Sequence, residues 1–383
     1  MKKLGLVLLL AAVGAFALTA CSKEEDIDTN FGVEQIIEGV NDASTVKGTS
    51  QEPENPEAEE EESHEGMYRS ELTNEWIDES LKNQRPIAVM IDNESTALPH
   101  YGINSADVVY EIMNSTKNNR ITRLMAICKD WKNITQLGSV RSTRPTNFML
   151  AAEWNAILIH DGGPFYNDQY YPKKYVNNLS GGFARIKNGK ATEFTEYVTY
   201  DDYTNSDGKT YEGLATHISK AGYSEEYNEY YPGPHFQFSN DELDVSNVPG
   251  AQAAKKVSLP FYHNNSKLVY NEETKLYEYY EYGEKHIDAI TGETTTFKNV
   301  ILQGVSHTQL DENGYLIYNV IGHGTNGYYL TNGYAIPMVW AKPDEAELTL
   351  FTNGSTGEDL VLNTGKTYIA VVPDDTWDEV ELN

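Results

Sequence analysis

The residues of this chain best suited to chemistry are arginines and hydroxyls gathered in one short stretch. Residues 137–149 read LGSVRSTRPTNFM, in which Arg141 and Arg144 flank Ser142 and Thr143. A guanidinium group presents a fork of N–H donors that matches phosphate and carboxylate geometry, and hydroxyl groups add further donors. This pattern predicts a site for an anion.

Arginine is otherwise scarce in this acidic chain. There are seven arginines, four of them lie between positions 120 and 144, and none follows Arg185. The chain as a whole carries a formal net charge of −29, so only a local concentration of cations could hold an anion. The same negative charge repels nucleic acid, and we expect no nucleic-acid partner.

A strand-to-helix turn must position these side chains. Proline disfavours the helical conformation in the residue before it, so a helix should begin at Pro145 and residues 142–144 should form the turn out of the preceding strand. The free amides of a helix start also favour an anion. Arg123, on the strand before, could point the same way. We therefore assign these residues to a candidate ligand site: Arg123, Arg141, Ser142, Thr143 and Arg144.

Internal ion pairs explain the same arginines equally well. Asp92 ends the first predicted strand and Glu111 lies on the second, and either could hold an arginine within the fold. Charge clusters of this kind occur both in ligand sites and in structural networks. The residues alone leave both interpretations open.

A second candidate for chemistry is the segment LIHDGG, residues 158–163, which ends a buried strand. Ligand sites of α/β folds form at the carboxyl ends of sheet strands. His160 beside Asp161 could act as a general base for a serine such as Ser142. A turn built on Asp-Gly-Gly is the plainer explanation of the same residues.

Metal and cofactor motifs are not found. Residues 201–214, DDYTNSDGKTYEGL, resemble a calcium loop, but alignment on Gly208 puts Tyr203 and Leu214 at the first and last ligand positions. The nine histidines form no close ligand pair in the sequence. There is no P-loop, no GxSxG and no GxGxxG between a strand and a helix. We expect no metal and no cofactor.

The N-terminus has the pattern of a lipoprotein signal. Residues 1–20 combine two lysines, a short apolar run and small residues directly before Cys21, and Leu18 stands three positions before that cysteine. This lipobox predicts cleavage, lipidation of Cys21 and anchoring to the outer face of the cell membrane. The other cysteine, Cys128, lies in an apolar run and is expected to be a small buried hydrophobe.

The rest of the chain divides by composition. Residues 21–66 are predicted to be an acidic tether, since positions 22–66 hold 15 acidic and 2 basic residues. Apolar runs separated by helical patterns predict an α/β domain with a mixed sheet at 67–242. Alternating Tyr, Leu, Val and Ile between Asn-Gly turns predict a mostly antiparallel β domain, a sandwich or open barrel, at 243–383.

This combination resembles the YerB-like lipoproteins of Gram-positive bacteria, whose core is a domain of unknown function. The stretches RPIAVMIDN, ADVVYEIM, ITRLMAI, LGSVRSTRP and ILIHDGG carry the resemblance in the first half, with HIDAITGETTTFKNVILQ and LNTGKTYIAVVP in the second. The resemblance implies the two-domain architecture and adds Asn93 to the candidate ligand residues. The motif positions it supports are Asp92, Asn93, Glu111, Thr122, Arg123, Arg141, Ser142, Arg144, His160, Gly162 and Gly163.

The chain also departs from the family pattern. The family usually carries a Pro-His-Asn stretch ahead of the helix that matches YEGLATHISKAGY, and here the chain reads EYVTYDDYTNSDGKT. An activity that needs that histidine is therefore not expected to be shared.

Three hypotheses follow for function. The first is an envelope lipoprotein without catalytic activity that binds an anionic ligand through its arginines, with a cell-wall glycan, a peptide or an envelope protein as partner. The second is a phosphotransferase or hydrolase acting on cell-wall precursors, similar to the LytR-CpsA-Psr enzymes, with Asp92, Glu111, His160 or Asp161 as candidate catalytic residues. The third is a scaffold in which every arginine is paired internally.

Overall fold

Three adjacent strands form the centre of the fold, which we describe for residues 64–383 of a computed structural model. They are β3 (Ile87–Asp92), β4 (Val108–Met113) and β5 (Thr122–Cys128), and every residue in them is buried. Continuous apolar runs of this kind are typical of strands covered on both faces. Strand β5 lies antiparallel between β3 and β4.

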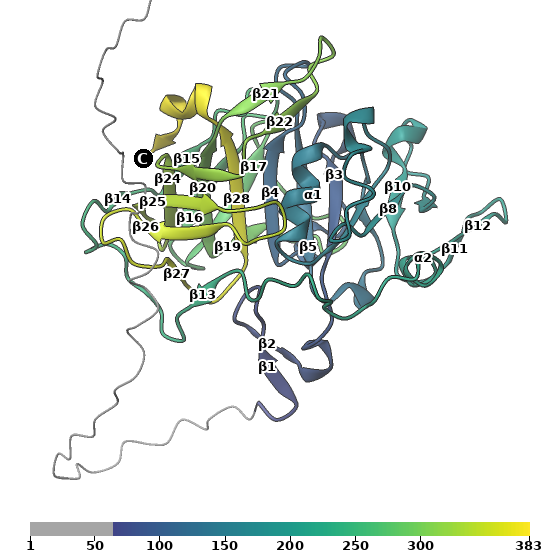
Figure 1. Ribbon diagram of the computed structural model, residues 1–383, viewed down its shortest axis with the longest axis horizontal. Helices are drawn as coiled ribbons and strands as arrows, with labels where there is room; N and C mark the ends of the chain where they lie inside the picture. The colour runs from purple at the N-terminus through teal and green to yellow at the C-terminus, as the bar shows by residue number, and fades with distance from the viewer. Residues whose placement is uncertain (1–63) are drawn as a thin grey trace, which may run out of the picture. The chain divides into compact units, whose positions relative to one another are not determined.

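The central sheet is large and mixed (Figure 1). Its parallel pairs are β3 with β7, β7 with β8, β4 with β28 and β28 with β20. Two further strands, β23 (Gly322–Gly324) and β26 (Leu350–Asn353), pair with β25. The main path runs through β14 (Gln252–Ala253), β25 (Tyr334–Lys342), β24 (Gly327–Thr331), β20 (Asn299–Val305), β28 (Thr367–Pro373), β4, β5, β3, β7 (Ile157–His160) and β8 (Asn178–Ser180).

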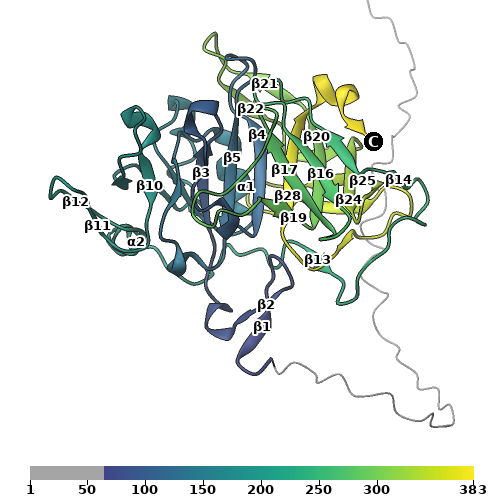
Figure 2. The same cartoon turned by 180° about the vertical axis from the view of Figure 1, so that it is seen from behind.

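A second, antiparallel sheet packs against one face of the central sheet, and Figure 2 shows its strands from behind. Tyr277, Tyr279 and Phe297 of this second sheet share a core cluster with Val89 and Val109 of the central one. Its strands are β18 (Glu284–Lys285), β17 (Leu276–Glu281), β16 (Lys267–Asn271), β15 (Lys256–Ser258), β29 (Glu381–Leu382) and β19 (Thr296–Phe297).

The opposite face of the central sheet is covered by helix α1 (Pro145–Ala152), which begins at the predicted proline. All eight residues of α1 are buried, and Phe148 and Met149 pack on Met90 and Met125 of the sheet. Helix α2 (Leu214–Ala221) ends at Gly222, whose φ of 68° is the left-handed cap that glycine tolerates. Within residues 64–383 neither helix is long and apolar enough to cross a bilayer.

Small sheets complete the described part of the chain. The predicted strand at 134–140 forms only β6 (Leu137–Gly138), which pairs with β10 (Glu196–Val198), itself paired with β9 (Ala184–Arg185). The remaining pairs are β1 (Met67–Arg69) with β2 (Trp76–Asp78), β11 (Tyr203–Thr204) with β12 (Thr210–Tyr211), β13 (Gln237–Phe238) with β27 (Val361–Leu362), and β21 (His307–Gln309) with β22 (Leu316–Tyr318).

The predicted fold class is confirmed: a mixed sheet with few helices comes first and antiparallel strands follow. The expected boundary at residue 243 falls between β13 and β14, and the central sheet takes strands from both sides of it because β28 pairs with β4. The predicted signal peptide, Cys21 and most of the predicted tether lie outside the described residues.

Candidate functional site

The two faces of the central sheet divide the predicted site residues into two groups. Successive side chains of a strand point to opposite faces. On β3, Ile91 belongs to the core cluster under the second sheet, whereas Met90 belongs to the cluster under α1, so Asp92 lies on the α1 face. On β4, Val109 faces the second sheet, and Glu111, two residues later, lies on the same face.

Asp92 binds two of the predicted arginines on the α1 face. Its carboxylate oxygens lie 3.0 Å from Arg123 Nη1 and 2.7 Å from Arg141 Nε. Asp92 is fully buried, while the Arg141 side chain is 23% exposed and reaches Glu193 on its outer side at 3.0 Å. Arg123 is the cross-strand neighbour of Asp92, which explains the first contact. The alternative of internal pairing therefore holds for Asp92.

Arg144 has different partners. Its Nε and Nη1 donate to the backbone oxygens of Asn114 and Thr143, at 3.0 and 2.8 Å, and its guanidinium lies 4.7 Å from the centre of the Tyr315 ring. It is only 8% exposed, and within residues 64–383 no carboxylate lies within ion-pair distance of it. Burial, with Arg123 and Arg141 nearby, lowers the pKa of Arg144 to about 10.

The predicted strand-to-helix turn is present, but the start of the helix is covered. Ser142 Oγ donates to the backbone oxygen of Asp161, and Thr143 Oγ1 accepts from Asn147. The first turn of α1 meets β22, where the Tyr318 amide donates to Thr146 Oγ1 at 2.9 Å. The helix start is therefore packed inside the fold, and any anion site at this turn depends on the arginine side chains.

His160 does not contact Ser142 as a base would. Its Nδ1 lies 2.9 Å from the backbone oxygen of Gly162, and its Nε2 lies 3.3 Å from the Asn178 amide. The ring is buried beside Phe148. Burial lowers the pKa of His160 to about 4. These contacts fix the strand end and leave no ring nitrogen directed at the hydroxyl.

Asp161 belongs to a carboxyl pair at the surface. Arg185 Nη2 lies 3.1 Å from Asp161 and 2.6 Å from Glu196, whose side chain is buried. Burial and the hydrogen bond to Asp161 raise the pKa of Glu196 to about 7, and the same hydrogen bond lowers the pKa of Asp161. The two carboxyl groups therefore share a proton below neutral pH.

This pair predicts a loss of stability as the pH rises. A carboxyl group whose pKa is raised in the folded state stabilises the fold below its unfolded pKa, near 4.5, and this contribution is lost as the pH approaches about 7. Glu196→Gln keeps a donor for Asp161 at every pH. Relative to wild type, it should gain about 1 kcal/mol between pH 5 and pH 8 in urea unfolding. An equal pH dependence in both proteins would refute the shared proton.

Glu111, on the opposite face, accepts hydrogen bonds from five side chains. Oε1 accepts from Thr122 at 3.0 Å and from Asn264 at 2.7 Å, and Oε2 accepts from Tyr279 at 3.0 Å. The other two donors are Asn93, at 3.2 Å, and Tyr368. Burial raises the pKa of Glu111 although these donors lower it. Glu111 therefore joins the two sheets, and within the described residues it forms no ion pair with an arginine, so the alternative of internal pairing does not hold for Glu111.

A histidine pair with a glutamate lies next to this network. His100 Nδ1 is 2.9 Å from His286 Nε2, and Glu281 Oε1 is 3.5 Å from His286 Nε2 and 3.9 Å from His100 Nδ1. All three residues are buried. Burial lowers the pKa of His100 to about 4 and raises the pKa of Glu281.

Sequence reasoning missed this group because its members are far apart in the chain. One local signal was available: residues 276–281 read LYEYYE and alternate between the surface and the core, with Glu281 in a core position after Tyr277 and Tyr279. An acidic residue where alternation demands an apolar one indicates a buried polar partner. No such signal marks His100.

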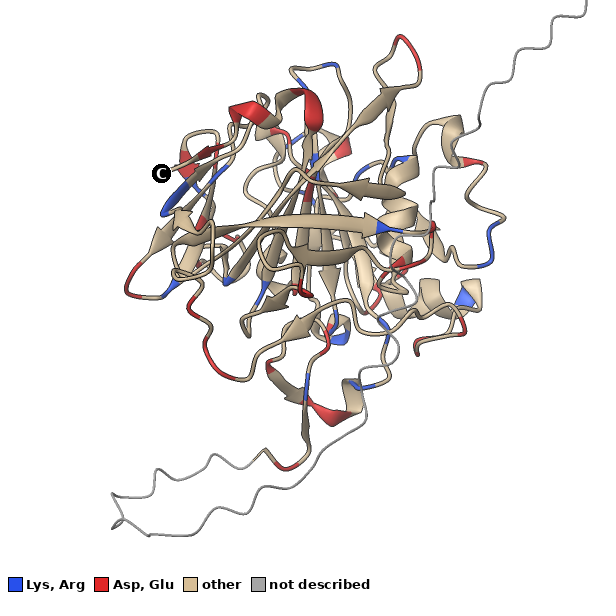
Figure 3. Cartoon of the chain, turned by 60° about the vertical axis from the view of Figure 1, so that its left-hand side comes forward, with Lys and Arg blue, Asp and Glu red and all other residues tan. Residues whose placement is uncertain are grey.

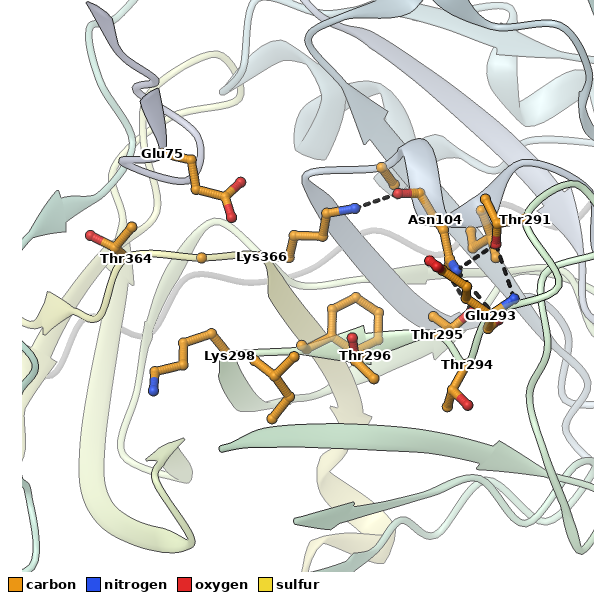
Figure 4. A pocket seen from close by; sticks show the side chains of 15 residues that line it. Glu75, Asn104, Thr291, Glu293, Thr294, Thr295, Thr296, Lys298, Thr364 and Lys366 are labelled. Carbon is orange, nitrogen blue, oxygen red and sulfur yellow. Dashed lines mark hydrogen bonds between the residues drawn. The ribbon is translucent and has the colours of Figure 1, made fainter. Parts of the chain in front are cut away.

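A cavity of about 330 Å³ opens next to the histidine pair, and Figure 4 shows the side chains that line this cavity. Its wall carries several threonines together with Lys298, Lys366, Glu75 and Glu293, and it contains none of the predicted site residues. Thr295 lines the cavity and also contacts His286. Around the molecule many outer loops carry acidic residues (Figure 3), in agreement with the acidic composition.

Comparisons with known proteins agree on the family. The model described as "Protein of unknown function (DUF3048) N-terminal domain" matches residues 72–224, and that of its C-terminal domain matches residues 257–369. The chain is 24% identical to "Putative lipoprotein YerB" of Bacillus subtilis (strain 168), over 80% of this chain and 86% of that protein. The crystal structure of YerB protein from Bacillus subtilis superimposes with a TM-score of 0.64 at 20% identity, covering 82% of this chain and 99% of that one. Because both family domains match in order and the fold is the same, the chain belongs to the YerB-like family of proteins of unknown function.

Proposed function

We propose that this protein is a cell-envelope lipoprotein that binds an anionic group, a phosphate or a carboxylate, at Arg123, Arg141 and Arg144. The lipoprotein part is supported by the name of the Bacillus subtilis relative and by the lipobox before Cys21. It implies a lipid anchor in the membrane and an outward-facing binding domain. The ligand then comes from a cell-wall glycan, a peptide or an envelope protein.

The observation that carries the binding proposal is the excess of guanidinium over carboxylate in the cluster. Three arginines lie close together: burial lowers the pKa of both Arg123 and Arg144, Arg141 lowers that of Arg123 further, and Arg123 and Arg141 together lower that of Arg144 further. The only buried carboxylate paired with them among the described residues is Asp92, and Glu193 is half exposed. A buried cation without a counter-ion costs several kcal/mol, and an anionic ligand would offset that cost.

The arginines also keep donors free. Within residues 64–383, Arg144 Nη2 and Arg141 Nη1 donate no hydrogen bond, and neither nitrogen is among the fully buried polar atoms. The outer partner of Arg141 is the half-exposed Glu193, which lies on a 3₁₀ turn. A competing anion can displace this carboxylate from Arg141. A bidentate contact to a phosphate would use such donors.

Binding is favoured over the transferase or hydrolase alternative because, within the described residues, the candidate bases Asp92, Glu111 and His160 are not free beside the arginines. Asp92 is held by two guanidinium groups, and Glu111 lies on the other face of the sheet. The ring nitrogens of His160 contact Gly162 and Asn178. A general base needs a free lone pair within reach of the group it deprotonates.

Calorimetric titration with pyrophosphate and with inorganic phosphate tests the proposal. We expect wild type to bind at least one of them, and Arg144→Gln to weaken the Kd by about tenfold or more, because a charge-assisted hydrogen bond contributes about 1.5–3 kcal/mol. Arg141 is more exposed, and Arg141→Gln should also weaken the Kd. This variant replaces Arg144→Gln in the test if Arg144→Gln does not fold.

Arg120→Gln is the matched control, since the Arg120 side chain is 25% exposed, much like that of Arg141, and pairs with Asp375 outside the cluster. It should bind as wild type does. Absence of binding up to about 10 mM of either anion, or an unchanged Kd in both cluster variants, would remove the proposed site.

A further inference from the structure

We propose that His100, His286 and Glu281 bind a divalent transition-metal ion, with Zn²⁺ as the best match, and that this ion ties the two family domains together. The proposal is independent of the anion site, which lies on the other face of the central sheet. It rests on the geometry of three ligand atoms, on the hydrogen bonds behind them and on a buried oxygen without a partner.

The three atoms form a triangle of the right size. Its sides are 2.9 Å between His100 Nδ1 and His286 Nε2, 3.5 Å from His286 Nε2 to Glu281 Oε1, and 3.9 Å from His100 Nδ1 to the same oxygen. A point at the centre of this triangle lies about 2.0 Å from each atom, and Zn–N and Zn–O bonds measure about 2.0–2.2 Å. The three separations therefore match those of atoms bound to one ion.

The hydrogen bond behind His100 leaves its inner nitrogen without a proton. His100 Nε2 lies 2.7 Å from the backbone oxygen of Asp92, which can only accept, so Nε2 carries the hydrogen. In a neutral imidazole the other nitrogen, Nδ1, is then a bare lone pair. This is the tautomer that a metal ion requires.

The contacts behind His286 have the same result. The amide of Asn104 donates to the Thr291 hydroxyl and the Glu293 backbone oxygen, which fixes Asn104 Oδ1 as the atom facing Thr295. Thr295 Oγ1 gives its one proton to that oxygen at 2.7 Å, so it accepts from His286 Nδ1 at 2.8 Å. His286 Nε2 is therefore also bare.

Two bare nitrogens 2.9 Å apart repel each other unless a cation lies between them. Beside them Glu281 Oε1 is buried and accepts no hydrogen bond within the described residues. A buried carboxylate oxygen without a partner is costly, and one cation would satisfy all three atoms. Two imidazoles and one carboxylate are typical ligands of Zn²⁺.

The position of the site favours a structural ion over an exchanging one. Thr295 separates His286 from the cavity of Figure 4, so the described residues close the site on that side. His100 lies in the region that matches the N-terminal family model, and Glu281 and His286 lie in the C-terminal one. A metal there would therefore connect two regions that are 186 residues apart at the histidines.

Metal analysis and thermal unfolding of the full chain provide the test. Protein purified without chelator is expected to contain about one Zn²⁺ per chain, and removal of the metal should lower the Tm by about 5 °C or more, with recovery on adding Zn²⁺. Co²⁺ added to the apoprotein should give a visible absorption clearly stronger than that of hydrated Co²⁺, as bound imidazole and carboxylate ligands would produce.

Two variants separate metal binding from general damage to the core. Glu281→Gln removes a ligand charge, and Thr295→Val removes only the hydroxyl behind His286; each should weaken the Co²⁺ Kd by about tenfold or more. His307→Gln, a half-exposed histidine outside the triangle, should leave it unchanged.

Absence of bound metal in protein grown with zinc, together with no Co²⁺ absorption and no change in Tm, would overturn the proposal and leave a proton shared between the two histidines. Co²⁺ binding that persists unchanged in both variants would place the ion elsewhere and overturn it too.

Discussion

Lys342→Met is expected to lower the free energy of unfolding by about 3–5 kcal/mol, because it removes the lysine paired with the buried Glu153 carboxylate. Lys342 Nζ lies 3.0 Å from Glu153 Oε2, and both side chains are at most 1% exposed. Although burial raises the pKa of Glu153, that pKa is held well below its usual range by Lys342, by His235 at 3.5 Å and by hydrogen bonds such as that from Thr349. The carboxylate therefore stays ionised, and urea unfolding at neutral pH measures the loss.

Two comparisons make this result specific. Lys187→Met removes a lysine whose ion pair with Asp207 is largely exposed, and it should cost less than about 1 kcal/mol. Adding Glu153→Gln to Lys342→Met removes the unpaired charge and should restore part of the lost stability. If the single variant loses less than about 1 kcal/mol, the ion pair between Glu153, directly after α1, and Lys342, on β25, does not stabilise the fold as predicted.

Asp92→Asn is the second substitution with a large expected effect, again about 3–5 kcal/mol. Asp92 is fully buried and forms ion pairs with both Arg123 and Arg141. The amide keeps the shape of the side chain but leaves the guanidinium groups of Arg123 and Arg141 without their buried counter-ion. Chemical unfolding of the purified protein gives the loss directly.

Phosphate in the buffer connects this prediction with the proposed anion site. If the cluster accepts an anion, millimolar phosphate should stabilise Asp92→Asn more than wild type. Glu193→Gln, which removes the exposed partner of Arg141, should cost less than about 1 kcal/mol. If Asp92→Asn also loses less than about 1 kcal/mol of stability, water rather than Asp92 stabilises the charged guanidinium groups.

Local patterns predicted the elements of the first half well. The apolar runs that became β3, β4, β5 and β7 are strands, and α1 begins at Pro145 because proline is compatible with a first helical turn and incompatible with the interior. The run at 134–140 formed only two residues of strand, since its later residues enter the turn beside Asp92. The alternation of tyrosines in the second half predicted antiparallel strands such as β16 and β17.

The candidate site was predicted less completely, for reasons that concern strand pairing. In the sequence, Asp92 and Glu111 are equally plausible partners for an arginine. The register of β3, β4 and β5 nevertheless puts them on opposite faces of one sheet. Asp92 therefore receives the arginines, while Glu111 receives Tyr279 and Tyr368. No local pattern carries this information, because the face of a side chain depends on which neighbouring element covers it.

The amino-acid sequence by itself determined which apolar runs form the central strands of the first half, where α1 begins, and the family to which the chain belongs. These follow from the backbone preferences and hydrophobicity of neighbouring residues. Only the tertiary structure decided which charges meet. Glu153 and Lys342 are 189 positions apart, and His100 and His286 are 186 apart, so their contacts arise when β28 joins β4 and the second sheet closes over the first. Contacts over such separations depend on the pairing of whole strands, and burial then makes them strong.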